Sequence, residues 1–423
     1  MSETKNIIII GASAAGHTLA NSLLPHLPTT HRILVIDASD YAYWAPAGIR
    51  AAVKPGWEKR VTVPVSTETF FPAGSAHQVI APNKVVELKK NSIVLEKPFE
   101  GSKEVQFAKC VLATGALQPA PMRAELGSSM ADMQTVLRKM QTEIAQAKKV
   151  VVIGGGPVGV EFAGEVRELL PSTSITIVHN QSRILNPSSN PNPAQKAEAW
   201  SAPSSYPKLS TALEAELKAL NIDVILNDRV DIPSGEASEG AWNGTSGSLG
   251  GVKTLKLQSG KTVEADYVFV SVGNKSGAGL VEQADKGAID GSMVKVDEFL
   301  RVTSSSPDSI LSADYYAIGD VCNTPGWKTS QTAVADAQYA ATSILAEVKG
   351  TKPKKYARSP MHALLVPLGT SRGAGSITVP YLGTFMAPKM VVGFKAKDLF
   401  IGQAFVGIFK GAEKVSVPDV AAA

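Results

Sequence analysis

The chain has 423 residues, more than one hydrophobic core normally holds, so two or three domains are expected. A formal net charge of +4, with 19% charged residues, does not fit the clustered positive charge of nucleic-acid-binding proteins, and no nucleic-acid partner is expected. The two cysteines, Cys110 and Cys322, lie far apart, which argues against a disulfide framework and against a reductase that works through neighbouring thiols.

The N-terminal residues lack the pattern of a secretion signal or transit segment, and no apolar run is long enough to span a bilayer. We therefore expect a cytoplasmic protein that is not secreted. The six histidines lack the spacing of metal ligands, so no metal site is expected.

A first dinucleotide-binding unit is predicted near the N-terminus. An apolar strand at 6–10 leads into the turn Gly11-Ala12-Ser13-Ala14-Ala15-Gly16, a helix follows to Leu24, and a second strand at 32–37 ends on Asp37. Free N–H groups and the helix dipole at such a turn attract phosphate. Gly11 permits the tight turn, Gly16 lets the helix approach the strand, and Ser13, Ala14 and Ala15 are expected beside a pyrophosphate. Asp37, 21 residues after Gly16, has the position of a carboxylate that accepts ribose hydroxyls.

A second unit repeats this pattern. A strand at 149–153 leads into Gly154-Gly155-Gly156-Pro157-Val158-Gly159, a helix follows to Leu170, and a strand at 174–179 ends on His179. Gly154, Gly156, Pro157, Val158 and Gly159 are predicted to hold a second dinucleotide, and Glu161 lies two residues into the helix. Because His179 replaces the usual carboxylate and Arg183 follows four residues later, we expect NADPH to be accepted, and NADH as well.

Further elements are predicted between and after the two units. They are a hairpin around Lys90-Asn91, a strand ending at Thr114-Gly115, helices at 130–147, 209–220 and 332–348, and strands at 223–226, 267–272 before Gly273, and 315–318 before Gly319-Asp320. Residues 186–207 and 233–251, rich in Pro, Ser, Asn and Gly, are predicted to be surface insertions. Residues 351–423 differ in composition from the preceding segments, with short apolar stretches and several lysines. They are expected to pack against the first domain, to cap the active site, to form a dimer face or to touch a membrane surface.

The chain resembles the FAD-dependent pyridine-nucleotide oxidoreductases, the family that contains glutathione reductase and type II NADH dehydrogenases. The matching residues are the turn Gly11–Gly16 with Asp37, Ala113-Thr114-Gly115, the turn Gly154–Gly159 with Glu161, Ser271-Val272-Gly273, and Ala317-Ile318-Gly319-Asp320. Within this family the chain is most similar to the apoptosis-inducing-factor-like branch of ferroptosis suppressor proteins. Stretches 40–51, 327–337 and 364–400 carry that closer likeness.

The resemblance implies a role for each matching residue. The first unit would hold FAD, aided by Arg50, the backbone of Lys84, Thr114, Gly115, Gly319 and Asp320, and the second would hold NAD(P)H with Gly273. Glu161 would orient the nicotinamide, Lys328 would stabilise charge on the reduced flavin, and Lys395 would favour the oxyanion that develops on a quinone.

An α/β fold is therefore expected, with two Rossmann-like dinucleotide-binding domains and a C-terminal α+β segment. The expected division is 1–118 and 297–350 for the FAD-binding domain, 119–296 for the NAD(P)H-binding domain and 351–423 for the C-terminal domain. The resemblance implies an enzyme, an NAD(P)H:quinone oxidoreductase. Two alternatives stay open: a flavin oxidase or monooxygenase acting on a small metabolite, and a redox signalling protein like apoptosis-inducing factor.

Overall fold

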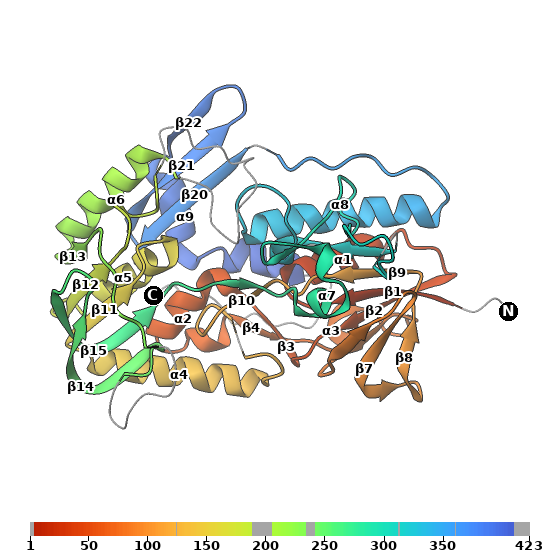
Figure 1. The fold of residues 1–423 in the computed structure, drawn as a ribbon, viewed down its shortest axis with the longest axis horizontal. Coiled ribbons are helices and arrows are strands. Elements are labelled where there is room, and N and C mark those ends of the chain that lie inside the picture. Colours follow the sequence, from red (N-terminus) through yellow and green to blue (C-terminus); the bar gives the residue numbers. More distant parts are fainter. Residues whose placement is uncertain are drawn as a thin grey trace.

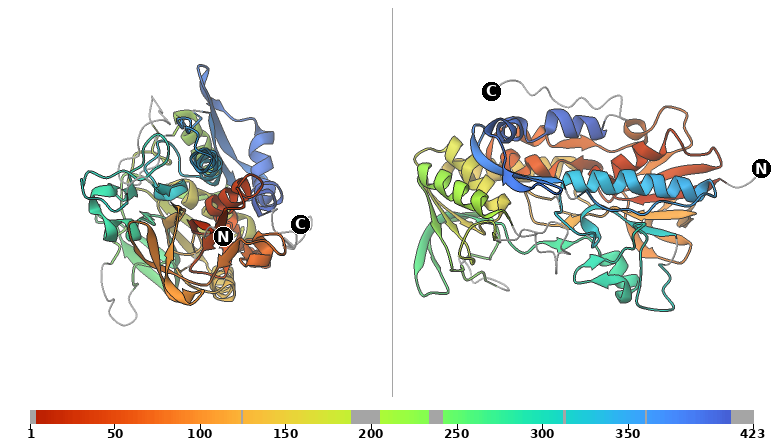
Figure 2. Two further views of the ribbon diagram at one scale, coloured as in Figure 1. Left: turned by 90° about the vertical axis from the view of Figure 1, so that its right-hand side faces the viewer. Right: turned by 90° about the horizontal axis from the view of Figure 1, so that it is seen from above.

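The computed structural model describes residues 4–123, 125–187, 205–233, 242–311, 314–359 and 361–409. Two five-stranded sheets, the first all parallel and the second largely parallel, lie side by side along the long axis of the molecule, and a C-terminal antiparallel unit rests against both halves (Figures 1 and 2). Most of the predicted insertion at 186–207 lies outside the described residues. Among the helices of the described ranges, none is both long and apolar enough to cross a membrane.

The first sheet has the strand order β19-β9-β1-β2-β5, all parallel. Its strands are β1 (Lys5–Ile10), β2 (His31–Ile36), β5 (Gln78–Ile80), β9 (Lys109–Leu112) and β19 (Tyr315–Ala317). One face is covered by helices α1 (Ala14–Leu23) and α8 (Ser330–Val348), and the other by the antiparallel sheet β6 (Val85–Leu88), β7 (Ser92–Phe99) and β8 (Ser102–Gln106) (Figure 1). Because side chains alternate along a strand, Ile7 and Ile9 enter one core, whereas Ile8 and Ile10 enter the other.

The second sheet has the order β13-β12-β11-β15-β14, in which only β14 is antiparallel to its neighbour. Its strands are β11 (Lys149–Ile153), β12 (Ser174–Val178), β13 (Ile222–Ile225), β14 (Gly247–Lys256) and β15 (Thr262–Val270). The helices of this half are α4 (Met130–Gln146), α5 (Pro157–Leu169) and α6 (Pro207–Ala219). Pro157 and Pro207 start α5 and α6, as expected for proline in a first helical turn.

The predicted insertion at 233–251 is wrong at its C-terminal end. Residues 234–241 lie outside the described ranges, but Trp242 is buried and β14 begins at Gly247. A glycine-rich stretch still forms a strand here because it pairs antiparallel with β15, with an irregularity between Ser248 and Lys253.

Several shorter elements lie outside the two five-stranded sheets. They are β3 (Tyr41–Tyr43), α2 (Gly48–Val53), β4 (Thr62–Pro64), α3 (Thr67–Phe70), β10 (Ala116–Leu117), β16 (Lys275–Ser276), α7 (Gly279–Ala284), β17 (Ile289–Asp290) and β18 (Met293–Val294). Strands β10 and β16 pair antiparallel where the chain passes between the two sheets. The first and second five-stranded sheets are therefore joined by a two-stranded connection.

The C-terminal unit consists of strands β20 (His362–Leu368), β21 (Arg372–Val379) and β22 (Gly383–Met386), followed by α9 (Lys389–Asp398), a π-helical turn (Ile401–Phe405) and α10 (Val406–Ile408). Strand β20 lies so close to α5 that a methyl group at Gly164 would be 2.5 Å from the Cα of Leu368. Phe405 packs on Trp44, and Trp44 Nε1 donates to the carbonyl of Leu399. The packing expected for this segment therefore accounts for its buried apolar residues.

His17 on α1 is a buried polar side chain without a polar partner. Its ring lies 3.8 Å from that of Phe70 and 4.3 Å from that of Phe409, measured between centroids, and neither ring nitrogen has a hydrogen-bond partner in the described structure. Burial lowers the pKa of His17 from 6.5 to about 3.

We expect His17→Leu to remove a destabilisation that appears in acid. Below pH 6.5 the unfolded chain protonates at His17 and the folded chain does not, so the free energy of unfolding falls by about 1.4 kcal/mol per pH unit down to about pH 3. Urea unfolding at pH 7 and pH 5 should show that the variant loses about 2 kcal/mol less than the wild type over this interval. The exposed His26, changed to Leu, is the control. Equal losses in His17→Leu and wild type would refute the assignment.

Candidate active site

The first glycine turn is built for close backbone contact. Gly11 has φ +109°, and a methyl group there would lie 2.4 Å from the carbonyl oxygen of Ala113. A methyl group at Gly16 would lie 1.8 Å from the carbonyl oxygen of Gly11. Helix α1 can therefore begin directly against β1, and Ser13, Ala14 and Ala15 form its N-terminal turn, where unpaired N–H groups can bind an anion.

Asp37 follows β2 beside this turn. Its carboxylate accepts hydrogen bonds from the N–H groups of Ala12 (2.6 Å) and Ser39 (2.9 Å). Burial raises the pKa of Asp37 to about 6, against the effect of these two donors. A ligand hydroxyl would supply a further donor to this desolvated carboxylate and stabilise its ionised form.

The backbone of Lys84 is already bonded within the protein. Its N–H donates to Asn83 Oδ1 (2.9 Å), and its carbonyl accepts from the N–H of Glu96 (2.8 Å). A hydrogen bond from FAD to this backbone must therefore use the second lone pair of the Lys84 carbonyl oxygen.

Gly115, Gly319 and Asp320 meet at the carboxyl edge of the first sheet. Gly115 and Gly319 have φ of +66° and +76°, which favours glycine, and Thr114 Oγ1 donates to the carbonyl of Gly277. Sequence reasoning missed Arg123. Its guanidinium lies 3.5 Å from the point that a Cβ on Gly115 would occupy and 3.3 Å from Asp320 Oδ2. Its Nε is buried without a hydrogen-bond partner in the described structure. The only signal in the sequence was a basic residue shortly after the strand that ends at Gly115.

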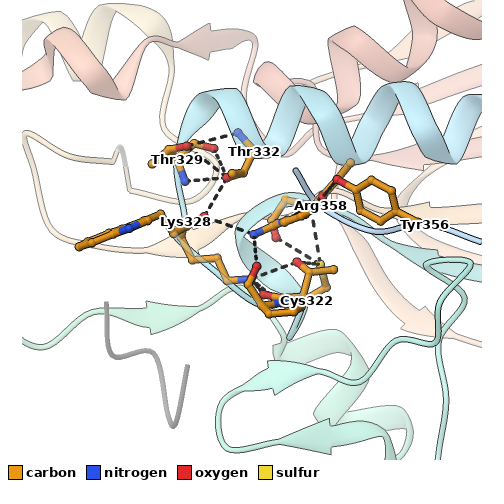
Figure 3. Close-up of polar contacts among 11 residues, drawn as sticks. Cys322, Lys328, Thr329, Thr332, Tyr356 and Arg358 are labelled. Carbon is orange, nitrogen blue, oxygen red and sulfur yellow. Dashed lines mark hydrogen bonds and ion pairs between the residues drawn. The ribbon is translucent and has the colours of Figure 1, made fainter. Parts of the chain in front are cut away.

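Lys328 belongs to a hydrogen-bond network around the start of α8 (Figure 3). Its Nζ donates to the carbonyls of Cys322 (2.5 Å) and Thr324 (3.0 Å), and burial lowers its pKa. Arg358 donates to the carbonyls of Pro325 and Trp327. The ammonium of Lys328 therefore holds the loop that follows Asp320.

Asp336 anchors the same loop from within α8. It is fully buried, pairs with Arg358, and accepts from Tyr356 Oη (2.7 Å) and from the N–H of Gly319 (3.0 Å). The position of Gly319 is thereby fixed by a buried carboxylate with two further partners.

The second glycine turn repeats the close packing of the first. Gly154 has φ +113°, and a methyl group at Gly159 would lie 2.1 Å from the carbonyl oxygen of Gly154. The Cα of Gly156 instead faces open space, with no atom within 4 Å of a methyl group placed there. Pro157 and Val158 begin α5 at this opening, and Gly273, with φ +87°, also faces open space. The open position at Gly156 is where a phosphate can approach the backbone.

His179 and Arg183 flank this turn. His179 Nδ1 accepts from the N–H of Gly155 (3.1 Å), so its ring packs on the turn. Arg183 pairs with Glu214 of α6 through Nε (3.0 Å) and Nη2 (2.6 Å). The guanidinium expected to meet a 2′-phosphate is thus engaged by a carboxylate.

Glu161 and Lys395 form a partly buried ion pair, although 234 positions separate them in the sequence. Lys395 Nζ donates to Glu161 Oε1 (2.7 Å) and to the carbonyl of Leu365 (2.8 Å). Burial raises the pKa of Glu161, and the charge of Lys395 opposes that rise. The structure thereby brings together two residues to which the family resemblance assigned separate roles.

Arg50 is fully buried and binds protein groups with all three guanidinium nitrogens. It pairs with Glu165, one turn after Glu161 on α5, and donates to the carbonyls of Lys397 (3.0 Å) and Gly369 (3.2 Å). Arg50 of α2 therefore links α5 and the C-terminal unit. The resemblance instead implied that Arg50 would contact FAD.

A cleft of about 320 Å³ opens beside β10 and β16 and is lined by Ala116, Leu117, Arg123 and Gly273, among others. A second, smaller depression is lined by Val158, Phe269 and Val272. Both border the second glycine turn or the residues near Gly115. Within the described residues, no group of three or more His, Cys, Asp or Glu side chains has the arrangement of a metal site.

Comparison with known proteins decides the family. The sequence pattern of the pyridine nucleotide-disulphide oxidoreductase family matches residues 5–337. The chain belongs to this family. Apoptosis-inducing factor homolog B of Dictyostelium discoideum is 27% identical over 412 residues, which cover 95% of this chain and 96% of that protein. Ferroptosis suppressor protein 1 of Xenopus tropicalis is 25% identical over 407 residues, with 95% and 96% covered.

Solved structures agree on the fold. The sulfide:quinone oxidoreductase of Aquifex aeolicus superimposes with a TM-score of 0.66 at 17% identity, covering 96% of this chain and 92% of that one. A persulfide reductase from A. fulgidus gives 0.60 at 21% identity, with 88% and 64% covered. At these identities the likeness shows the fold alone.

Membership of the pyridine nucleotide-disulphide oxidoreductase family confirms the resemblance, the α/β fold class and the two expected cofactors, FAD and NAD(P)H. The residues present fit both cofactors, because each glycine turn exposes N–H groups at a helix start and Gly156 leaves room for a phosphate. The protein is thus an NAD(P)H-dependent flavin oxidoreductase. Both cysteines are buried and unpaired, so this chain lacks the neighbouring thiols from which the family takes its name.

Proposed function

We propose that this protein is an NAD(P)H:quinone oxidoreductase. When bound, the two cofactors supply hydride transfer from nicotinamide to flavin. The observation that carries the proposal is the Glu161–Lys395 pair. It places the ammonium of Lys395, from the C-terminal unit, at the start of α5, the helix that follows the second glycine turn. The resemblance to ferroptosis suppressor proteins and the lack of a thiol pair favour a small organic acceptor over a disulfide.

The acceptor is tested by reducing the FAD-loaded protein with NADPH under anaerobic conditions and mixing it with a soluble quinone, with oxygen or with a disulfide. We expect the flavin absorbance to recover fastest with the quinone. Rapid recovery with oxygen and slow recovery with quinone would favour an oxidase instead. A long-lived charge-transfer band with a change in oligomeric state would favour a redox signalling protein.

Lys395 is expected to act by holding Glu161 ionised. Lys395→Met should therefore raise the pKa of Glu161 and slow flavin reduction by about tenfold to a hundredfold, with the larger loss at low pH. Stopped-flow reduction across a pH series measures this. Lys395→Arg should restore most of the rate, and Glu161→Gln should be slow at every pH. A uniform loss in Lys395→Met, without a change in the pH profile, would contradict this role.

A membrane-facing surface is proposed on the C-terminal unit. Tyr381 and Leu382 at the β21–β22 turn are exposed, and this hairpin projects from the body (Figures 1 and 2). Residues 348–397 contain no Asp or Glu. Of their basic residues, Arg358, Arg372 and Lys395 pair with carboxylates, whereas Lys389 and Lys397 of α9 are exposed. An exposed apolar tip on a basic segment suits an anionic lipid surface.

Sedimentation with vesicles, with and without an anionic phospholipid, tests this surface. The double variant Tyr381→Ser, Leu382→Ser should bind anionic vesicles at least about fivefold more weakly than wild type. Leu126→Ser, which changes an exposed apolar residue outside the C-terminal unit, is the control. Unchanged lipid binding with a changed sedimentation coefficient would instead indicate a homodimer contact.

The domain boundaries are also a proposal. We propose 1–118 with 297–350 for FAD, 119–296 for NAD(P)H and 351–423 for the C-terminal domain. Sheet membership supports this division, since β1, β2, β5, β9 and β19 share one sheet and β11 to β15 share the other.

A further inference from the structure

The loop after β12 folds back onto the second glycine turn. The N–H of Leu185 donates to the carbonyl of Gly155 (2.9 Å), while the N–H of Gly155 donates to His179 Nδ1 (3.1 Å). Arg183 is the only charged residue between these two ends of the loop. It is thereby held near the place where the second strand of a βαβ unit meets the adenosine ribose.

Glu214 of α6 engages this arginine with both carboxylate oxygens. Oε1 accepts from Nε (3.0 Å) and Oε2 from Nη2 (2.6 Å), and Nη2 also donates to Thr211 Oγ1 (2.8 Å). The side chains of Arg183 and Glu214 are 34% and 27% exposed, so an incoming ligand can reach the pair. A bidentate arginine–carboxylate pair has a fixed geometry and carries no net charge.

NADPH differs from NADH only by the phosphate on its 2′-oxygen, so discrimination depends on charge beside that oxygen. His179 at the strand end supplies no carboxylate, and Arg183 would attract the phosphate if it were unpaired. We infer that Glu214 determines the coenzyme preference, because its carboxylate neutralises Arg183 and repels the 2′-phosphate. This inference rests on the proposed function, specifically on the second turn being the NAD(P)H site.

Glu214→Gln should shift the preference toward NADPH. The carboxamide is similar in shape but uncharged, so it removes the repulsion and leaves the arginine able to bind phosphate. We expect the ratio of kcat/KM for NADPH to that for NADH to rise about tenfold, the effect of one charge on a phosphate dianion about 6 Å away in water. Calorimetry with 2′,5′-ADP and 5′-AMP, which needs no electron acceptor, should show the same shift.

Glu216→Gln is the matched control. Glu216 lies on the same helix and pairs with Arg372 (3.2 Å), so its removal changes the total charge equally at another place. The ratio should change less than about twofold in this variant. The double variant Arg183→Met, Glu214→Gln should lose the gain of the single one.

Three outcomes separate the inference from its premise. A tenfold shift confined to Glu214→Gln supports it. Binding of both nucleotides with an unchanged ratio in Glu214→Gln overturns it and leaves the proposed function standing. No binding of either nucleotide to the wild type overturns the assignment of the site, and the proposed function with it.

Discussion

Gly156→Val is expected to abolish reduction by NADPH while the protein still folds and binds FAD. The new side chain meets no protein atom within 4 Å of its Cβ, and the backbone of Gly156 (φ −73°, ψ 177°) is accessible to any residue. The same side chain would occupy the approach to the N–H groups at the start of α5, where the pyrophosphate must bind. We expect kcat/KM for NADPH to fall by at least about a hundredfold.

Visible absorbance measures the bound FAD, and stopped-flow kinetics measure its reduction by NADPH. Gly279→Val is the control, since Gly279 on α7 also faces open space and has no special backbone conformation. Unchanged NADPH reduction in Gly156→Val would mean that the dinucleotide does not bind at this turn. Loss of flavin would mean that the two sites are not independent.

Arg50→Met is expected to lower the free energy of unfolding by about 3–5 kcal/mol, because it leaves the buried carboxylate of Glu165 without its partner. It also removes the donors to Gly369 and Lys397, which tie the C-terminal unit to α2. Urea unfolding followed by tryptophan fluorescence measures the loss. The double variant Arg50→Met, Glu165→Leu should recover most of it, since no buried charge then remains.

Arg60→Met is the control for Arg50. The guanidinium of Arg60 lies 5.1 Å from the Trp57 ring centroid, almost as that of Arg50 does at 5.0 Å, but no carboxylate pairs with it in the described structure. We expect its loss to cost less than about 1 kcal/mol. FAD binding adds a second comparison. If the stable double variant lost FAD, Arg50 would be a cofactor ligand, as the resemblance implied, rather than a clamp between domains.

The two glycine turns could be predicted from the sequence because their requirements are local. Gly11 and Gly154 have positive φ within their own turns, and Gly16 and Gly159 lie against the carbonyls of those two residues. An apolar strand and a helix adjoin each turn in the sequence. Local geometry depends on neighbouring residues, so a pattern of glycines and apolar residues is sufficient to indicate the fold class and both cofactors.

The partners of the charged side chains were decided by the tertiary structure alone. Lys395 meets Glu161, Arg50 meets Glu165, Arg123 meets Asp320 and Arg183 meets Glu214 only because separate elements converge. A cation in the sequence carries no mark of the carboxylate it will face, since ion pairs depend on distance in space and on burial. The sequence thus determined which nucleotides this protein binds. The packing of α2, α5, α6 and the C-terminal unit decided which charged side chains remain free to contact those nucleotides.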